Sequence, residues 1–300
     1  MMEQARIERR AAAGQNGFFR VSVPQNAVLF EAGAPADALY LVEEGRMAMV
    51  DGQTGAVVGT AGAGEAFGEQ AILRGGVRSA AARGHLPSTL LEIPASALRD
   101  TLEKQNASLQ ALFHAAMLEL SLWNRARQGR LSETAPFQVP VDRLMLGRSR
   151  GELQHTLTSP AHQLAVPEFL LLKLVLNPKL DTLALSEEKD LRQVLFSFGQ
   201  ALVLTHGTVT FHCDGMTFYG GPGTVLGLSG SLCRLPEFSV RPLSTINALV
   251  LPMERLVGDL VGLNAGLLAV LRSIVLRTLK RAEAPPSMVA VLSARRRRQA

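Results

Sequence analysis

The segment from Ala66 to Ala81 holds the side chains of this sequence that are best suited to bind an anion. Arg78 carries a guanidinium that stays charged and can donate two parallel hydrogen bonds to one anionic group. Ser79 adds a hydroxyl, and Glu69 adds a hydrogen-bond acceptor. Taken alone, an arginine and a glutamate in one loop are more commonly an exposed ion pair, worth about 1 kcal/mol or less. The surrounding elements have to decide between the two interpretations.

Other kinds of chemistry find little support in the sequence. The two cysteines, Cys213 and Cys233, form neither a disulfide framework nor a metal-binding spacing. None of the six histidines pairs with Asp, Glu or Cys at metal-ligand spacing, and no nucleophile–base motif stands out. We therefore expect no metal, no cofactor and no enzymatic activity.

The net charge of +5 comes largely from the end of the chain. Arg295–Arg298 supply four positive charges, so the rest of the chain carries a formal charge of +1. Such a terminus is usually a solvated tail, and the alternative is contact with nucleic acid or an anionic membrane. The N-terminus lacks the apolar core of a secretory signal, and the apolar stretch 257–279 is too polar to span a membrane. We expect a cytoplasmic protein without a membrane span.

Residues 18–93 contain short apolar runs separated by glycines, a pattern typical of strands in a β-barrel. From 95 to about 128, leucines at helix-like spacing predict helices that close this barrel. The strand-sized runs are 27–30, 39–42, 47–50 and 57–58.

The same plan returns in the second half of the chain. Three landmarks recur with nearly one offset, which favours a duplicated domain over a short-period repeat. They are Gly45 and Gly207 at an offset of 162, Gly68 and Gly227 at 159, and Pro94 and Pro252 at 158.

The anion-binding segment resembles the phosphate-binding cassette of the cyclic-nucleotide-binding domain family. This family includes the catabolite activator protein and the regulatory subunits of cyclic-AMP-dependent kinase. Its pattern is Phe-Gly-Glu, a small residue, a short gap, then Arg, a small residue and Ala. The matching residues here are Phe67, Gly68, Glu69, Ala71, Arg78, Ser79 and Ala80.

The resemblance implies a role for each cassette residue. Arg78 and Ser79 would hold the phosphate, together with free N–H groups of a helical turn that begins after Glu69 and includes Gln70. Gly68 would let the backbone approach the ribose. Glu69 would accept a hydrogen bond from the ribose 2′-hydroxyl. Ser79 favours cyclic AMP modestly over cyclic GMP.

The family also implies a wall and a lid for the base. Met49, Val58 and Ala61 fall where the barrel wall would meet the base, although such residues are equally well explained as core. Trp123 and Asn124 fall near the place of the lid, where Trp123 could stack on a purine. The alternative is that Trp123 makes a helix–helix or dimer contact.

The second copy departs from the cassette pattern at the decisive positions. Leu228 stands at the position of Glu69, and the stretch 235–239, which matches the positions of Arg78 and Ser79, contains no cation. A phosphate there would lose its paired charge. We expect this barrel to keep its fold without binding a nucleotide.

The expected architecture is therefore mainly β with α: two cyclic-nucleotide-binding-type barrels (jelly roll), each followed by helices. The helix from 256 to 279 is apolar nearly all round, so we expect it to bury against a twin in a homodimer or along the helix 107–128. The expected segments are an N-terminal segment 1–17, a domain 18–128, a linker 129–165, a degenerate domain 166–283 and a basic tail 284–300.

The leading functional hypothesis is a sensor that binds cyclic AMP or cyclic GMP in the first barrel and signals to a protein partner by a helix rearrangement. One alternative is a transcription regulator of the catabolite-activator type. Specific DNA binding is not expected, because a second barrel occupies the place of a helix-turn-helix module. The other alternative is a scaffold or regulatory subunit that no longer depends on ligand.

Overall fold

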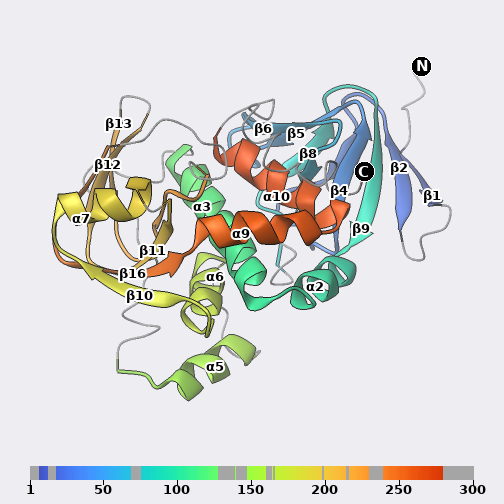
Figure 1. The fold of residues 1–300 in the computed structure, drawn as a ribbon. Coiled ribbons are helices and arrows are strands. Elements are labelled where there is room, and N and C mark those ends of the chain that lie inside the picture. The colour runs from blue at the N-terminus through green and yellow to red at the C-terminus, as the bar shows by residue number, and fades with distance from the viewer. Residues whose placement is uncertain are drawn as a thin grey trace, which may run out of the picture. The chain divides into compact units, whose positions relative to one another are not determined.

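A computed structural model of the chain divides into two compact units that exchange one segment each (Figure 1). Unit 1 comprises Met1–Lys104 and Asn264–Glu283, and unit 2 comprises Gln105–Leu263 and Ala284–Ala300. The structure describes residues 7–12, 18–68, 76–127, 139, 147–159, 164, 166–197, 199–213, 216–229 and 239–279.

Unit 1 contains a β-barrel of two antiparallel sheets, in the orders β1-β2-β9-β4-β7 and β3-β8-β5-β6. In β2 the buried Val21 and Val23 alternate with the exposed Arg20 and Ser22, as the two-residue period of a strand requires. Two helices, α2 (Ala95–Glu103) and α10 (Ala265–Thr278), complete the unit. The strands are β1 Glu8–Ala11, β2 Phe19–Val23, β3 Val28–Phe30, β4 Ala38–Glu44, β5 Arg46–Val50, β6 Val57–Gly62, β7 Ala66–Phe67, β8 Ala81–Gly84 and β9 Ser88–Pro94.

Unit 2 also contains two antiparallel sheets, in the orders β10-β16-β11-β14 and β13-β12-β15. The strands are β10 Asp181–Leu185, β11 Ala201–His206, β12 Val209–Cys213, β13 Met216–Gly220, β14 Val225–Leu226, β15 Ser239–Pro242 and β16 Ile246–Leu251. The helices are α3 Ala107–Arg127, α5 Arg150–Thr158, α6 Val166–Val175, α7 Glu188–Arg192, the π-helix η1 Gln193–Ser197, α9 Met253–Asp259 and the 3₁₀ turn η2 Leu260–Gly262.

The strand orders confirm the predicted duplication. The order β2-β9-β4-β7 of unit 1 recurs as β10-β16-β11-β14 in unit 2, and β8-β5-β6 recurs as β15-β12-β13. Gly45 and Gly207 take the same left-handed backbone, at φ of 85° and 83°. Asn106 and Asn264 cap the following helices in the same way, because each side chain accepts a hydrogen bond from a backbone N–H three residues later.

The helices that follow the two barrels are exchanged between the units. Helix α3 follows the first barrel in sequence but belongs to unit 2, where it packs on β14, α6 and α9. Helix α10 follows the second barrel but belongs to unit 1, where it packs on β7 and α2. The sequence-based boundaries at 128 and 166 therefore differ from the division seen in the structure, which falls at 104 and 263.

One local expectation was wrong. The stretch 256–279 is not one helix, because η2 and the cap of Asn264 separate α9 from α10. Its second half, α10, packs on β7 and α2 of the same chain. The apolar residues of α10 that suggested a homodimer are therefore covered within the chain, and their burial does not require a second copy. The segment 1–17 contains the strand β1, which pairs with β2. The segment 284–300 lies outside the described residues, as does most of 129–165.

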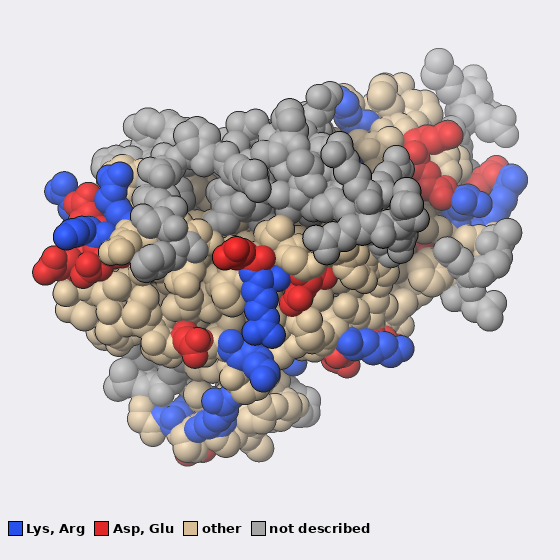
Figure 2. Space-filling view, in the orientation of Figure 1, with Lys and Arg blue, Asp and Glu red and all other residues tan. Residues whose placement is uncertain are grey.

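Charged side chains on the described surface are mixed in sign. On the face shown in Figure 2, Lys and Arg lie in small groups beside Asp and Glu. Arg20 Nε lies 2.8 Å from Glu43 Oε2, and Arg241 Nε lies 2.9 Å from Glu188 Oε2. Among the helices that the structure describes, none is long and apolar enough to cross a membrane.

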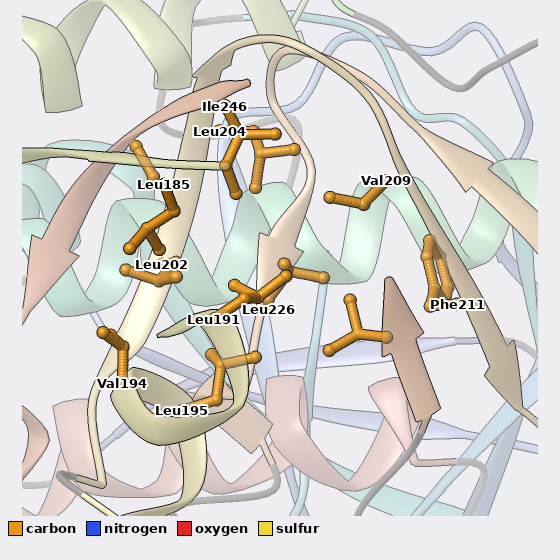
Figure 3. Close-up of a cluster of buried hydrophobic side chains, with 12 residues drawn as sticks. Leu185, Leu191, Val194, Leu195, Leu202, Leu204, Val209, Phe211, Leu226 and Ile246 are labelled. Atoms are coloured by element: carbon orange, nitrogen blue, oxygen red, sulfur yellow. The ribbon is translucent and has the colours of Figure 1, made fainter. Parts of the chain in front are cut away.

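Apolar side chains fill the interior of the second barrel (Figure 3). Leucines of β11 and α7 point toward one another there, together with the ring of Phe211 from β12. Each fully buried Leu or Phe side chain stabilises the fold by about 1.5–3 kcal/mol. This core explains why the barrel folds although its cassette has changed.

The turn at Gly207 yields a prediction about stability. A Cβ at Gly207 would lie 2.4 Å from the Thr245 carbonyl oxygen, whereas a Cβ at Gly199, which is also left-handed, meets nothing within 4 Å. Gly199→Ala should cost about 1 kcal/mol for the left-handed backbone alone, and Gly207→Ala at least about 3 kcal/mol. Both losses of stability can be measured by urea unfolding followed by the fluorescence of Trp123, which lies in unit 2 and is the only tryptophan of the chain. Equal losses would contradict the prediction.

Candidate functional site

The backbone of Arg78 is fixed by the turn at Gly33 and Ala34. The Arg78 N–H donates to the Ala34 carbonyl at 2.8 Å, and the Gly33 N–H donates to the Arg78 carbonyl at 2.8 Å. Gly33 has a φ of 83°, which a residue with a side chain rarely adopts. The neighbouring Val77 forms an isolated antiparallel bridge with Pro35. These contacts direct the Arg78 side chain into unit 1, where only 4% of the residue is exposed.

Backbone carbonyls and aromatic rings surround the guanidinium of Arg78. Its Nη2 donates to the Ala38 carbonyl at 2.6 Å and its Nη1 to the Gly68 carbonyl at 3.1 Å. The guanidinium carbon lies 4.1 Å from the centre of the Phe30 ring and 5.7 Å from that of Tyr40. A buried cation needs such hydrogen bonds and ring faces to offset the loss of hydration. The structure therefore holds a charge inside the first barrel.

Phe67 and Gly68 lie directly beside this arginine. The Phe67 ring is fully buried and stacks on Tyr40 at a centroid distance of 5.4 Å. Gly68 has a φ of 85°, and a Cβ there would lie 2.6 Å from Arg78 Nη1. Only glycine combines that backbone with so close an approach. Burial raises the pKa of Tyr40 to about 12, so its ring remains a neutral phenol next to the cation.

The remaining cassette residues are only partly visible. Ser79 is exposed and Ala80 is half-buried, next to Arg78 in the chain. Glu69, Gln70 and Ala71 lie outside the described residues. The structure thus brings together the phenylalanine, glycine and arginine of the motif.

The three residues proposed for the base wall differ in exposure. Met49 is half-buried against the core cluster of unit 1, and Ala61 belongs to that cluster at 1% exposure. They lie on the paired strands β5 and β6, and Val58 on β6 is 39% exposed. Their contact with a base stays a prediction.

Trp123 lies in the core of unit 2. Its ring meets Phe211 at 6.1 Å and Phe218 at 5.5 Å, edge to face in both cases. This placement differs from the expectation that Trp123 covers a base in the first barrel, because α3 belongs to unit 2 and provides the indole with aromatic partners there. The side chain of Asn124 lies outside the described residues.

A buried carboxyl group lies at the degenerate cassette of unit 2. Leu228, at the position of Glu69, is fully buried. The next residue, Ser229, donates its hydroxyl to Glu119 Oε2 of α3 at 2.5 Å. Burial raises the pKa of Glu119 to about 7, although the hydroxyl and the backbone N–H of Ser229 act in the opposite direction. Sequence reasoning missed Glu119 because a glutamate among the polar positions of a helix is usually solvated.

The degenerate cassette of unit 2 lies within the described residues up to Ser229. Arg241 forms an ion pair with Glu188, which is not a residue of the cassette. Residues 230–238, which include the match to Arg78, lie outside the described residues. Within the described ranges no group of three or more His, Cys, Asp or Glu side chains could hold a metal ion.

Comparison with known proteins places a family match on the first barrel. Residues 20–105 match the cyclic nucleotide-binding domain family. An uncharacterized NTE family protein of Mycobacterium bovis is 34% identical over 116 residues, which is 39% of this chain and 19% of that protein. The chain thus spans about a fifth of the length of the curated relatives it matches.

The chain also matches solved structures, and the two named here have TM-scores below 0.5. A cyclic nucleotide-binding domain from Methylobacillus flagellatus is 26% identical, with 29% of this chain and 51% of that chain covered and a TM-score of 0.27. The regulatory subunit of a cAMP-independent protein kinase A from Trypanosoma brucei, a mutant bound to cAMP, is 14% identical. Its match covers 93% of this chain and 85% of that chain at a TM-score of 0.35. The assignment of the fold therefore rests on the strand orders and on the family match.

The buried carboxyl of Glu119 predicts a specific pH dependence. Its pKa is about 7 in the fold against 4.5 in the unfolded chain, so the folded state binds the proton more tightly. Its contribution to stability is complete below pH 4.5 and is lost as the pH rises to about 7, a change of about 3 kcal/mol. Glu119→Gln keeps an acceptor for Ser229 and removes this titration, so the variant should gain stability relative to wild type between pH 5 and pH 8.

Urea unfolding followed by Trp123 fluorescence at several pH values measures this difference. Glu254→Gln, which changes an exposed carboxyl of unit 2, controls for the loss of one negative charge. If the stabilities of wild type and Glu119→Gln depended on pH in the same way, the raised pKa of Glu119 would be contradicted.

Proposed function

We propose that the chain is a sensor that binds a cyclic nucleotide in the barrel of unit 1, where residues 20–105 match the cyclic nucleotide-binding domain family, and that it signals to a protein partner. The observation that carries the proposal is the guanidinium of Arg78, which is buried inside this barrel and held at the first cassette glycine, Gly68. A buried cation that is held by carbonyl dipoles can exchange those partners for a phosphate, which offers a full negative charge.

The cassette supplies a contact for each part of the nucleotide. In this proposal Arg78 and Ser79 bind the phosphate, together with the backbone N–H groups of Gln70 and Ala71. Glu69 accepts the ribose 2′-hydroxyl, and Ala80 follows the arginine closely. Met49, Val58 and Ala61 form the wall against the base. We propose cyclic AMP, in preference to cyclic GMP, as the ligand.

The second barrel has a structural and signalling role in this proposal. Leu228 replaces the acid that would hold the ribose, and Ser229 is engaged by Glu119 of the same unit. We propose that unit 2 binds no nucleotide and presents a surface to the partner. The homodimer, through α3 or through α9 and α10, and the location in the cytoplasm remain predictions.

The relatives favour a regulatory rather than a catalytic role. In the uncharacterized NTE family proteins the matched segment is about a fifth of the chain. A segment that recurs inside much longer proteins is suited to control the output of other segments. The transcription-regulator alternative has less support, because a second barrel stands in the place of a helix-turn-helix module.

Calorimetric titration with cyclic AMP and cyclic GMP tests the proposal. Wild type should bind, with cyclic AMP the tighter ligand. Arg78→Lys keeps the charge but cannot donate two parallel hydrogen bonds, and should weaken binding at least about 10-fold. Arg78→Ala should weaken binding by about 2–5 kcal/mol, which is 30-fold or more.

A control variant and a test of folding accompany the titration. Arg83→Ala changes an exposed arginine on β8 of the same unit and should leave the affinity within about 2-fold. Circular dichroism establishes that the Arg78 variants are folded. Unchanged affinity in a folded Arg78→Lys protein would reject the assigned site, and absence of binding by both nucleotides would reject the function.

A further inference from the structure

Helix α10 is in contact with the strand that leads into the cassette. It is the last helix of the second repeat, yet it belongs to unit 1 and packs on β7. β7 is only two residues long, Ala66–Phe67, and it lies at the edge of its sheet. An edge strand has backbone groups that need partners from outside the sheet.

One backbone group of this edge has a hydroxyl of α10 as its partner. The Ala66 N–H donates to Ser273 Oγ of α10 at 2.6 Å, and both residues are almost completely buried. Ser273 Oγ in turn donates to the Ala269 carbonyl at 2.9 Å. A buried N–H whose acceptor is removed costs about 1–3 kcal/mol, so this contact ties the position of α10 to that of β7.

Only Phe67 separates this contact from the phosphate-binding arginine. Ala66 is held by Ser273 on one side, and Gly68 is held by Nη1 of Arg78 on the other. Phe67 between them is fully buried in the ring cluster with Phe30 and Tyr40, so the segment is packed and transmits a displacement.

A phosphate competes for the guanidinium N–H groups that Gly68 and Ala38 now occupy. When Nη1 turns to the phosphate, the Gly68 carbonyl loses its donor, and the left-handed backbone at Gly68 is free to adjust. The adjustment reaches Ala66 and hence Ser273. Such coupling requires only that the nucleotide prefers one of two positions of β7.

We propose that α10 is the helix that responds to nucleotide in the first barrel, with the Ala66–Ser273 hydrogen bond as the coupling contact. This inference rests on the proposed nucleotide binding and assigns the response to the helix of the other repeat, not to α3. Only η2, Leu263 and Asn264 connect α10 to α9 of unit 2, so a displacement of α10 reaches unit 2 through the chain itself.

Hydrogen–deuterium exchange of the full chain, with and without saturating cyclic AMP, tests the inference. In wild type the nucleotide should change the exchange of residues 265–278 at least about 3-fold. In Ser273→Ala the helix should exchange faster without ligand, and its response to cyclic AMP should be lost while binding persists. Thr278→Val is the matched control, because it removes another buried hydroxyl of α10 that bonds within the helix, to the Ile274 carbonyl, and it should keep the response.

The outcomes separate the inference from the function on which it rests. If calorimetry finds no binding of cyclic AMP or cyclic GMP, the proposed function fails and the inference falls with it. If the nucleotide binds and the exchange of α10 is unchanged, only the inference is overturned. A Ser273→Ala protein that binds and responds like wild type would overturn the coupling contact.

Discussion

A charge buried inside an apolar barrel is the constraint on which the first half of this molecule depends. Two carbonyls and two ring faces replace part of the water that the guanidinium of Arg78 has lost, and the Asp37 carboxylate lies 3.9 Å from its Nη2. The left-handed turn at Gly33 fixes its backbone, and Gly68 leaves space for its Nη1. Gly33, Gly68 and the rings of Phe30 and Tyr40 thus act on one side chain, and together they hold a cation that is almost completely buried.

The duplication has produced two barrels with the same strand order and different interiors at the cassette. The first retains the arginine, whereas the second places a buried glutamic acid of α3 against Ser229. The carboxyl of Glu119 and the hydroxyl of Ser229 satisfy each other there, so this buried turn has a polar partner from its own chain.

The sequence was sufficient to predict the parts of the fold that are local. Strand-sized apolar runs and the landmarks Gly45 and Gly207 predicted two related barrels, and the Phe67–Gly68 and Arg78 motif predicted the residues that meet inside the first. It was not sufficient where the outcome depends on which of two similar barrels a helix packs against. The positions of Trp123 and Glu119 follow from the placement of α3 in unit 2, and no pattern within α3 distinguishes the two barrels. The break at Asn264 was detectable from its capping side chain, but the apolar residues on both sides of it favoured one continuous helix.

The exchange of helices also determines how the chain can be divided. A fragment that ends after α3 would contain the first barrel without α10, so the Ala66 N–H and the edge of β7 would be left uncovered. The same fragment would expose the apolar side of a helix whose partners lie in the missing half. Uncovered strand edges and bare apolar helices both promote association between molecules. Each barrel is therefore covered by a helix from the other repeat. Recombination that moves one repeat into another protein would have to include that helix as well.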